Sequence, residues 1–120
     1  MSSSLEFGQA LRTKRLALAE KDQRFSVRKL AARVGIEPSY LSKIERGEQP
    51  PPGEQNIRRL AGELGENADA LLAAAGKVSS DLLEIIRERP TVVAELLRAL
   101  RTLSTKRVTA ISQQIRDGDW

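Results

Sequence analysis

The chain has 120 residues, of which 40% are hydrophobic and only 3% aromatic, so we expect an aliphatic core of helices packed on helices. It contains no Cys and no His, which excludes thiolate and imidazole catalysis and most zinc or iron sites. The net charge of +4 is concentrated in residues 12–46, which hold ten basic and four acidic side chains. This bias is typical of a surface that binds a polyanion, although a solvated basic face would give the same count.

An amphipathic pattern predicts a first helix over residues 5–21. Its apolar face is marked by residues at spacings of four, four and three, namely Phe7, Leu11, Arg15 and Leu18. The charged Arg15 therefore lies on a face that is otherwise apolar. The polar segment EKDQRF follows and predicts a connection to the next element.

Residues 26–47 show two short helical patterns separated by a glycine. Ser26 is a good N-cap for the first of them, whose apolar stripe is Val27, Leu30, Ala31 and Val34. Gly35 can adopt the left-handed conformation that ends a helix, and Pro38 fits the first turn of the next one. This second helix, with Leu41 and Ile44 as its apolar residues, is too short to be stable unless it packs on the first. The pattern predicts a helix-turn-helix.

Two further helices complete an N-terminal domain over residues 1–76. The proline-rich segment GEQPPPGEQ predicts an extended loop, and residues 53–64 predict a fourth helix. Asn67 is expected to cap a short fifth helix that buries Leu71 and Leu72 and stops at Gly76.

Residues 79–120 form a second predicted unit with three apolar stripes. About 40 residues bury little surface alone, so such a unit usually needs a partner. We interpret it as a helical dimerisation domain; the alternative is an extension folded onto the N-terminal domain of the same chain. The expected interface residues are Leu82, Ile85, Ile86, Val93, Leu96, Leu97, Leu100, Leu103, Val108, Ile111 and Ile115. Trp120 either joins this interface or lies free.

The segments FGQALRTKR and GIEPSYLSKIERGE carry a resemblance to a known family. Over residues 6 to about 75, the chain resembles the phage repressor/Cro-like (XRE-type) helix-turn-helix regulators. The resemblance implies an all-α fold, in which a five-helix lambda-repressor-like DNA-binding domain is followed here by the small C-terminal helical dimerisation unit. It also implies that Arg15 and Glu45 form a partly buried salt bridge between the first and third helices.

The exposed face of the second motif helix is the expected base-reading surface, because such a helix enters the major groove. With Leu41 and Ile44 turned inward, the candidate base-reading residues are Ser39, Ser42, Lys43, Glu37 and Tyr40. Lys43 can donate to guanine, and the serines can donate or accept. Tyr40 has packing at the helix start as its alternative role. Glu37, where relatives often have Ser or Thr, either accepts from a cytosine amine or discourages wrong sites.

Phosphate contacts are expected at the margins of the motif, because a helix N-terminus attracts anions. The candidates are Arg24, Ser26, Arg28, Arg46, the Gly47 backbone and, more weakly, Lys14. Relatives often have Gln at the position of Val27, so one phosphate contact common in the family is missing here.

We expect a sequence-specific transcriptional regulator, and repression more than activation. One recognition helix reads few base pairs, so a palindromic operator bound by a homodimer is expected. Some similar repressors are inactivated when a partner metallopeptidase cuts the dimerisation region, and residues 96–104 would be the target; an uncut dimer controlled by its own concentration is the alternative. An antitoxin-like autoregulator, whose C-terminal helices bind a toxin, is the competing interpretation.

Enzyme activity is not expected. Without His or Cys, catalysis would need paired carboxylates or a Ser–Lys pair, and Glu84, Glu88 and Glu95 lie at spacings typical of solvated helix faces. No cofactor or metal is expected. The chain lacks an apolar signal core or a membrane span, which predicts a cytoplasmic protein.

Overall fold

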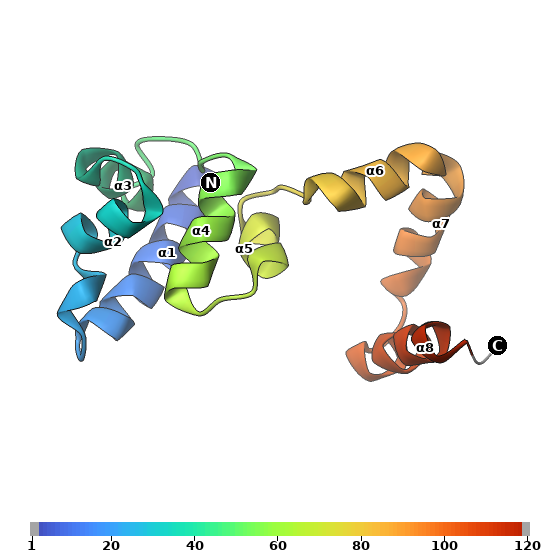
Figure 1. Ribbon diagram of the computed structural model, residues 1–120. Helices are drawn as coiled ribbons and strands as arrows, with labels where there is room; N and C mark the ends of the chain where they lie inside the picture. Colours follow the sequence, from blue (N-terminus) through green and yellow to red (C-terminus); the bar gives the residue numbers. More distant parts are fainter. Residues whose placement is uncertain (1–2, 119–120) are drawn as a thin grey trace. The chain divides into compact units, whose positions relative to one another are not determined.

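The computed structural model describes residues 3–118 and divides the chain into two compact units, with the boundary between Ser79 and Ser80. Within the described range the chain forms eight α-helices and one short 3-10 helix, without a strand (Figure 1). The expected all-helical fold is confirmed. Trp120 lies outside the described residues. None of the described helices is both long enough and apolar enough to cross a membrane.

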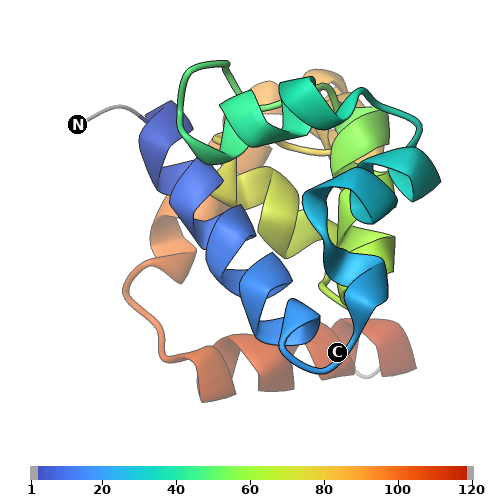
Figure 2. The same cartoon turned by 90° about the vertical axis from the view of Figure 1, so that its left-hand side faces the viewer.

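The first unit contains five α-helices around one core. They are α1 (Ser3–Ala19), α2 (Val27–Val34), α3 (Pro38–Glu45), α4 (Glu54–Leu64) and α5 (Ala68–Ala74), with the 3-10 helix η1 (Gln23–Phe25) between α1 and α2. Helix α1 packs on α3 and α4, and α2 packs on α3 and α4. Figure 2 shows the first unit from the side of α2 and α3. The buried hydrophobic residues are Phe7, Leu11, Leu30, Ala31, Val34, Leu41, Ile44, Ile57, Leu60, Ala61, Leu64, Leu71, Leu72 and Ala75.

The helix ends of this unit follow from local chemistry. The Ser26 hydroxyl accepts a hydrogen bond from the Lys29 amide at 3.2 Å, and the Asn67 side chain accepts one from the Ala70 amide at 3.0 Å. Both expected N-caps are therefore confirmed. Helix α2 is followed by its C-cap Gly35, whose φ of 88° is the left-handed conformation that the turn requires. Helix α1 ends at Ala19, two residues before the expected end, because the following turn leads into η1, which Asp22 caps.

Helices α1 and α3 approach closely at Gly8. A Cβ atom at this position would overlap the carbonyl oxygen of Ile44 and would lie 2.8 Å from that of Glu45. Only a residue without a side chain allows this contact between the two backbones. The glycine therefore sets how near the C-terminal end of α3 lies to α1.

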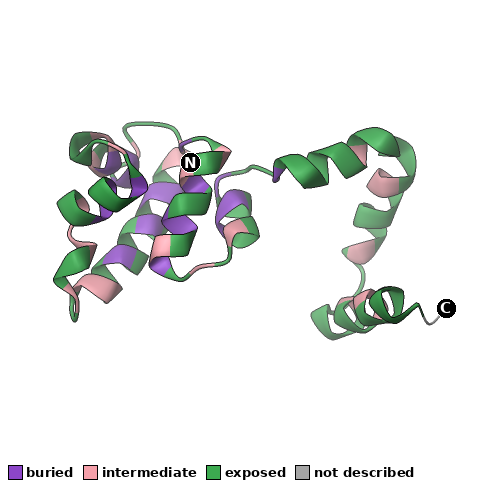
Figure 3. Ribbon diagram, viewed as in Figure 1, coloured by how far each residue is buried: buried purple, intermediate pink, exposed green. Residues whose placement is uncertain are grey.

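The second unit contains α6 (Ser80–Glu88), α7 (Pro90–Leu100) and α8 (Thr105–Asp117). Pro90 occupies the first turn of α7, and the Ser104 hydroxyl caps α8 by accepting from the Arg107 amide at 3.1 Å. Across residues 80–118, the described part of this unit, the three helices bury none of their residues (Figure 3).

Candidate nucleic-acid interface

Helix α3 is held by its apolar side and exposes the opposite side. Leu41 and Ile44 are fully buried against the core, whereas Ser39 and Lys43 are exposed and Ser42 is half-buried. Within residues 3–118 the Lys43 ammonium has no ion pair or hydrogen bond. A cation without a partner on the exposed side of this helix remains available to a ligand.

Two candidate base-reading residues that have alternative roles, Glu37 and Tyr40, lie at the start of α3. Glu37 is the N-cap residue and is exposed, but its side chain makes no capping hydrogen bond. Tyr40 is half-buried and packs against the core, as its alternative role requires. The Glu37 carboxylate is therefore the freer of these two groups.

A buried ion pair anchors α3 to α1. The Arg15 Nε donates to Glu45 Oε2 at 2.6 Å and Nη2 donates to Oε1 at 2.8 Å, and both residues are only 5–6% exposed. The remaining terminal nitrogen, Nη1, donates to the Phe25 carbonyl at 3.1 Å. The bidentate geometry fixes orientation as well as distance, so the pair holds the last residue of α3 against α1 and the turn before α2.

Side chains of α1, α2 and α3 converge on a groove beside the ion pair. The residues that line it are Arg12, Arg15, Val27, Ser42, Glu45 and Arg46. Arg12 is exposed and, within the described chain, has neither an ion pair nor a hydrogen bond. Sequence reasoning missed it, because an exposed Arg leaves no mark in the apolar pattern of α1. Its spacing of three from Arg15 was the signal available.

The other expected phosphate-binding residues differ in availability. Arg28 is exposed near the N-terminus of α2 and makes no ion pair within residues 3–118. Arg46 pairs with Glu48 at the end of α3, next to Gly47. Lys14 pairs with Glu66 at 2.6 Å and lines a different groove, together with residues of α5. The structure therefore brings Arg46 to the α3 groove and places Lys14 elsewhere.

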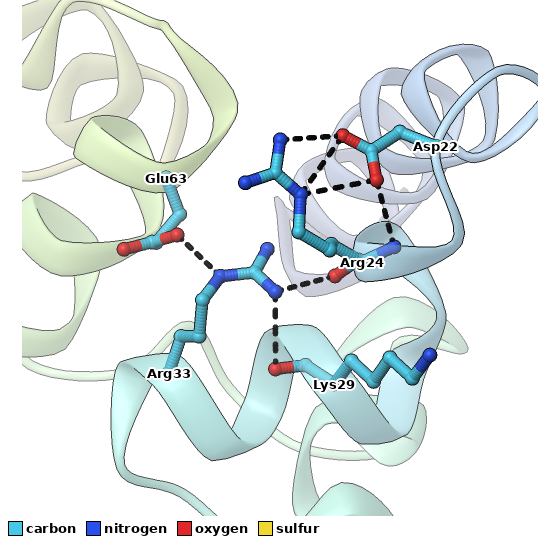
Figure 4. Close-up of polar contacts among 5 residues, drawn as sticks. All are labelled: Asp22, Arg24, Lys29, Arg33 and Glu63. Carbon is cyan, nitrogen blue, oxygen red and sulfur yellow. Dashed lines mark hydrogen bonds and ion pairs between the residues drawn. The ribbon is translucent and has the colours of Figure 1, made fainter.

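Arg24 belongs to a network that links η1, α2 and α4 (Figure 4). Its guanidinium donates to both oxygens of the Asp22 carboxylate, at 2.8–3.1 Å, and these hydrogen bonds lower the pKa of Asp22 from 3.8 to about 2. Arg33 donates to the Arg24 carbonyl and to Glu63, each at 2.6 Å, and lies 5.1 Å from the centre of the Phe25 ring. Arg24 is therefore already paired, and its charge is less available to DNA.

Comparison with known proteins agrees with this geometry. The model of a family described as helix-turn-helix domain matches residues 13–77, more than half of the chain. The chain belongs to this family, and the expected resemblance to XRE-type regulators is confirmed.

A relative from Bacillus subtilis (strain 168), named "Uncharacterized HTH-type transcriptional regulator RghRB", is 38% identical over 82 residues. The match covers 68% of this chain and 55% of the relative, so the chain spans about half the length of that protein. No solved structure matches the chain.

Proposed function

We propose that the protein is a sequence-specific transcriptional repressor that binds a palindromic operator as a homodimer. The observation that carries the proposal is helix α3, fixed by the buried Arg15–Glu45 pair while Ser39 and Lys43 remain exposed. A helix presented rigidly on a domain surface is what major-groove recognition requires. The name of the B. subtilis relative, a transcriptional regulator, supports the same function for this chain.

The exposed side chains divide into two roles. Lys43 and Ser39 lie on the exposed side of α3 and are proposed to contact base edges, with Ser42, Glu37 and Tyr40 beside them. Such contacts carry sequence information.

The groove beside α3 is proposed to receive the phosphate backbone. Arg46 and Arg12 line it, and Arg28 and the Ser26 cap lie at the N-terminus of α2. Phosphate contacts of this kind set affinity and register on the duplex.

Dimerisation follows from the size of the reading surface. One α3 helix spans only a few base pairs, so specific binding needs a second copy on a half-site about one helical turn away. The second unit supports this proposal, because across residues 80–118 it leaves its apolar side chains exposed or half-exposed. Repression is proposed because a dimer that covers an operator blocks polymerase without any further contact.

A binding experiment on the full chain separates the two roles. In Lys43→Ala, the preference for the selected site over random duplex should fall by about 1–3 kcal/mol, because a base contact is lost. In Arg28→Ala, affinity should fall about equally for both duplexes, and the slope of log affinity against log salt should decrease by about 1. Arg46→Ala should also weaken both duplexes, but less, since Arg46 is shared with Glu48.

Lys14→Ala is the matched control, because this lysine pairs with Glu66 away from the groove and should leave both affinities unchanged. Equal losses of preference in the Lys43 and Arg28 variants would overturn the assignment of roles. Full-chain protein that shows no salt-dependent affinity for any duplex would overturn the function itself.

A second candidate is the antitoxin-like regulator, in which the second unit covers a toxin. The same exposed apolar side chains favour it, because they fit a foreign partner as well as a second copy. A chain that is monomeric when pure would support this candidate against the homodimer.

A partner metallopeptidase remains part of the proposal as a switch. The segment 96–104 runs from the end of α7 into the connection before α8, and Leu103 in that connection is exposed. Cleavage there would separate α8 from α6 and α7 and would end dimerisation. Coexpression with a candidate metallopeptidase, followed by mass analysis of the chain, tests this step; an intact chain would overturn it.

A further inference from the structure

The second unit exposes an apolar surface on each of its helices. Val92 and Leu96 of α7 are 63% and 57% exposed, Ile85 of α6 is 51% exposed, and Ile115 of α8 is 62% exposed. Exposed apolar surfaces of this kind mark sites of interaction with another surface. What covers them must come from outside the three helices as they stand in one chain.

The connections explain why α6 and α8 do not cover each other within this unit. A single residue, Arg89, joins α6 to α7, whereas helices that fold back on one another need a loop of about two to five residues. Helices α6 and α7 contact one another, yet neither buries a residue. Figure 1 places α6 and α8 at the two ends of α7, so within this unit α7 lies between them.

The charges of the three helices differ in sign. Helix α6 has three acidic side chains and one basic, a net charge of −2. Helix α8 has three basic and one acidic, a net charge of +2, and α7 has one of each. In a twofold dimer, pairing α6 with α6 or α8 with α8 would bring like charges together, whereas pairing α6 with α8 joins opposite charges.

We propose that the occupant of these faces is a second copy of the chain, and that α6 of each copy packs on α8 of the other. The neutral α7 then pairs with its own equivalent at the twofold axis, where its strong apolar stripe meets itself without repulsion. This inference rests on the proposed homodimer and specifies its helix pairing. Opposite charges on α6 and α8 thereby select a second copy of this chain and set its orientation.

Charge reversal in the full-length protein tests the pairing. The first variant reverses α6 (Asp81→Lys, Glu84→Lys, Glu88→Lys), and the second reverses α8 (Lys106→Glu, Arg107→Glu, Arg116→Glu). In sedimentation velocity at low salt, each variant alone should self-associate at least about tenfold more weakly than the wild type, because both α6–α8 contacts become repulsive. An equimolar mixture should form a heterodimer as tight as the wild-type dimer, because opposite charges then face each other in both contacts.

A chain that carries all six reversals is the matched control. Its charges are complementary again, so it should recover wild-type self-association, and far-ultraviolet circular dichroism should show equal helix content in every variant. Single reversals that leave the dimer unchanged would overturn the α6–α8 pairing while leaving the homodimer intact. If each variant alone self-associates weakly and the equimolar mixture still forms no tight heterodimer, the attraction between α6 and α8 acts within one chain. That result would also overturn the pairing. A wild-type chain that is monomeric at every concentration would overturn the homodimer and this inference together.

Discussion

Helices of both units carry apolar stripes, but within residues 3–118 only the first unit buries residues of its stripes. Helix α2 buries three residues out of eight, whereas the eleven-residue α7 buries none. An amphipathic stripe thus predicts that a helix has an apolar face but does not reveal what covers it. The first unit covers its stripes internally and is built to hold α3 in place. The second unit leaves them open and is proposed to complete its core only in a dimer.

The largest effect separating the two units should come from breaking the buried ion pair. Arg15→Met leaves the Glu45 carboxylate buried without a partner, which should lower the free energy of unfolding by about 3–5 kcal/mol. Urea denaturation followed by circular dichroism measures this loss. The matched variant Arg98→Met, on an exposed position of α7, should change stability by less than about 0.5 kcal/mol. Similar losses in both variants would contradict the contrast between the units.

Leucine truncations sharpen the comparison further. Leu30→Ala in α2 removes a fully buried side chain and should cost about 2–5 kcal/mol at any protein concentration. Leu97→Ala in α7 removes a side chain that is 51% exposed, so it should leave the unfolding of the first unit unchanged and weaken self-association instead. Denaturation at two protein concentrations distinguishes these results. A cost for Leu97→Ala that does not depend on concentration would show that this leucine is buried within its own chain.

A smaller effect on stability is expected at Gly8, where the backbones of α1 and α3 are in close contact. Gly8→Ala forces a methyl group against the carbonyl groups at the end of α3 and should cost about 1–3 kcal/mol. Gly62 in α4 is a control in the same unit, because nothing lies within 4 Å of the position its Cβ would take. Gly62→Ala should stabilise the protein by about 0.5–1 kcal/mol in the same denaturation experiment. A stabilising Gly8→Ala would show that α1 and α3 are not in close contact.

The smallest effect is expected at the exposed Asp22–Arg24 pair. The pKa of Asp22 is lowered from 3.8 to about 2, so its ionised form stabilises the folded state above about pH 4, and this contribution disappears as the pH falls through 2. Asp22→Asn should therefore be slightly less stable than the wild type at pH 7, and this difference should be mostly lost at pH 2. Thermal denaturation at both pH values tests the sign. A difference that widens in acid would contradict it.

Much of the first unit could be predicted from sequence, because caps and periodicity act locally. Ser26, Gly35, Pro38 and Asn67 end or begin helices through their own backbone and side-chain chemistry, and each lies where the pattern placed it. The Arg15–Glu45 pair was implied by resemblance to a family and not by the pattern alone. Its bidentate geometry and its third contact, with the Phe25 carbonyl, required the structure.

The availability of the surface cations could not be predicted, because it depends on neighbours distant in sequence or on side-chain orientation. Lys14 is paired with Glu66 across the fold, Arg24 with Asp22 and Arg46 with Glu48, so three expected phosphate contacts already have partners. Arg12 reaches the α3 groove only through the packing of α1 on α3. Exposed charged residues produce no periodic pattern, so the sequence alone does not show which of them are free to bind phosphate.

The mass of the full chain in solution tests the central claim most directly. Light scattering coupled to size-exclusion chromatography, over a range of protein concentrations, measures it without DNA or any substitution. A second unit that completes its core with a second copy predicts a species of twice the 13.3 kDa chain mass. A mass of 13.3 kDa at every concentration would contradict the homodimer and would indicate that a different partner covers the second unit.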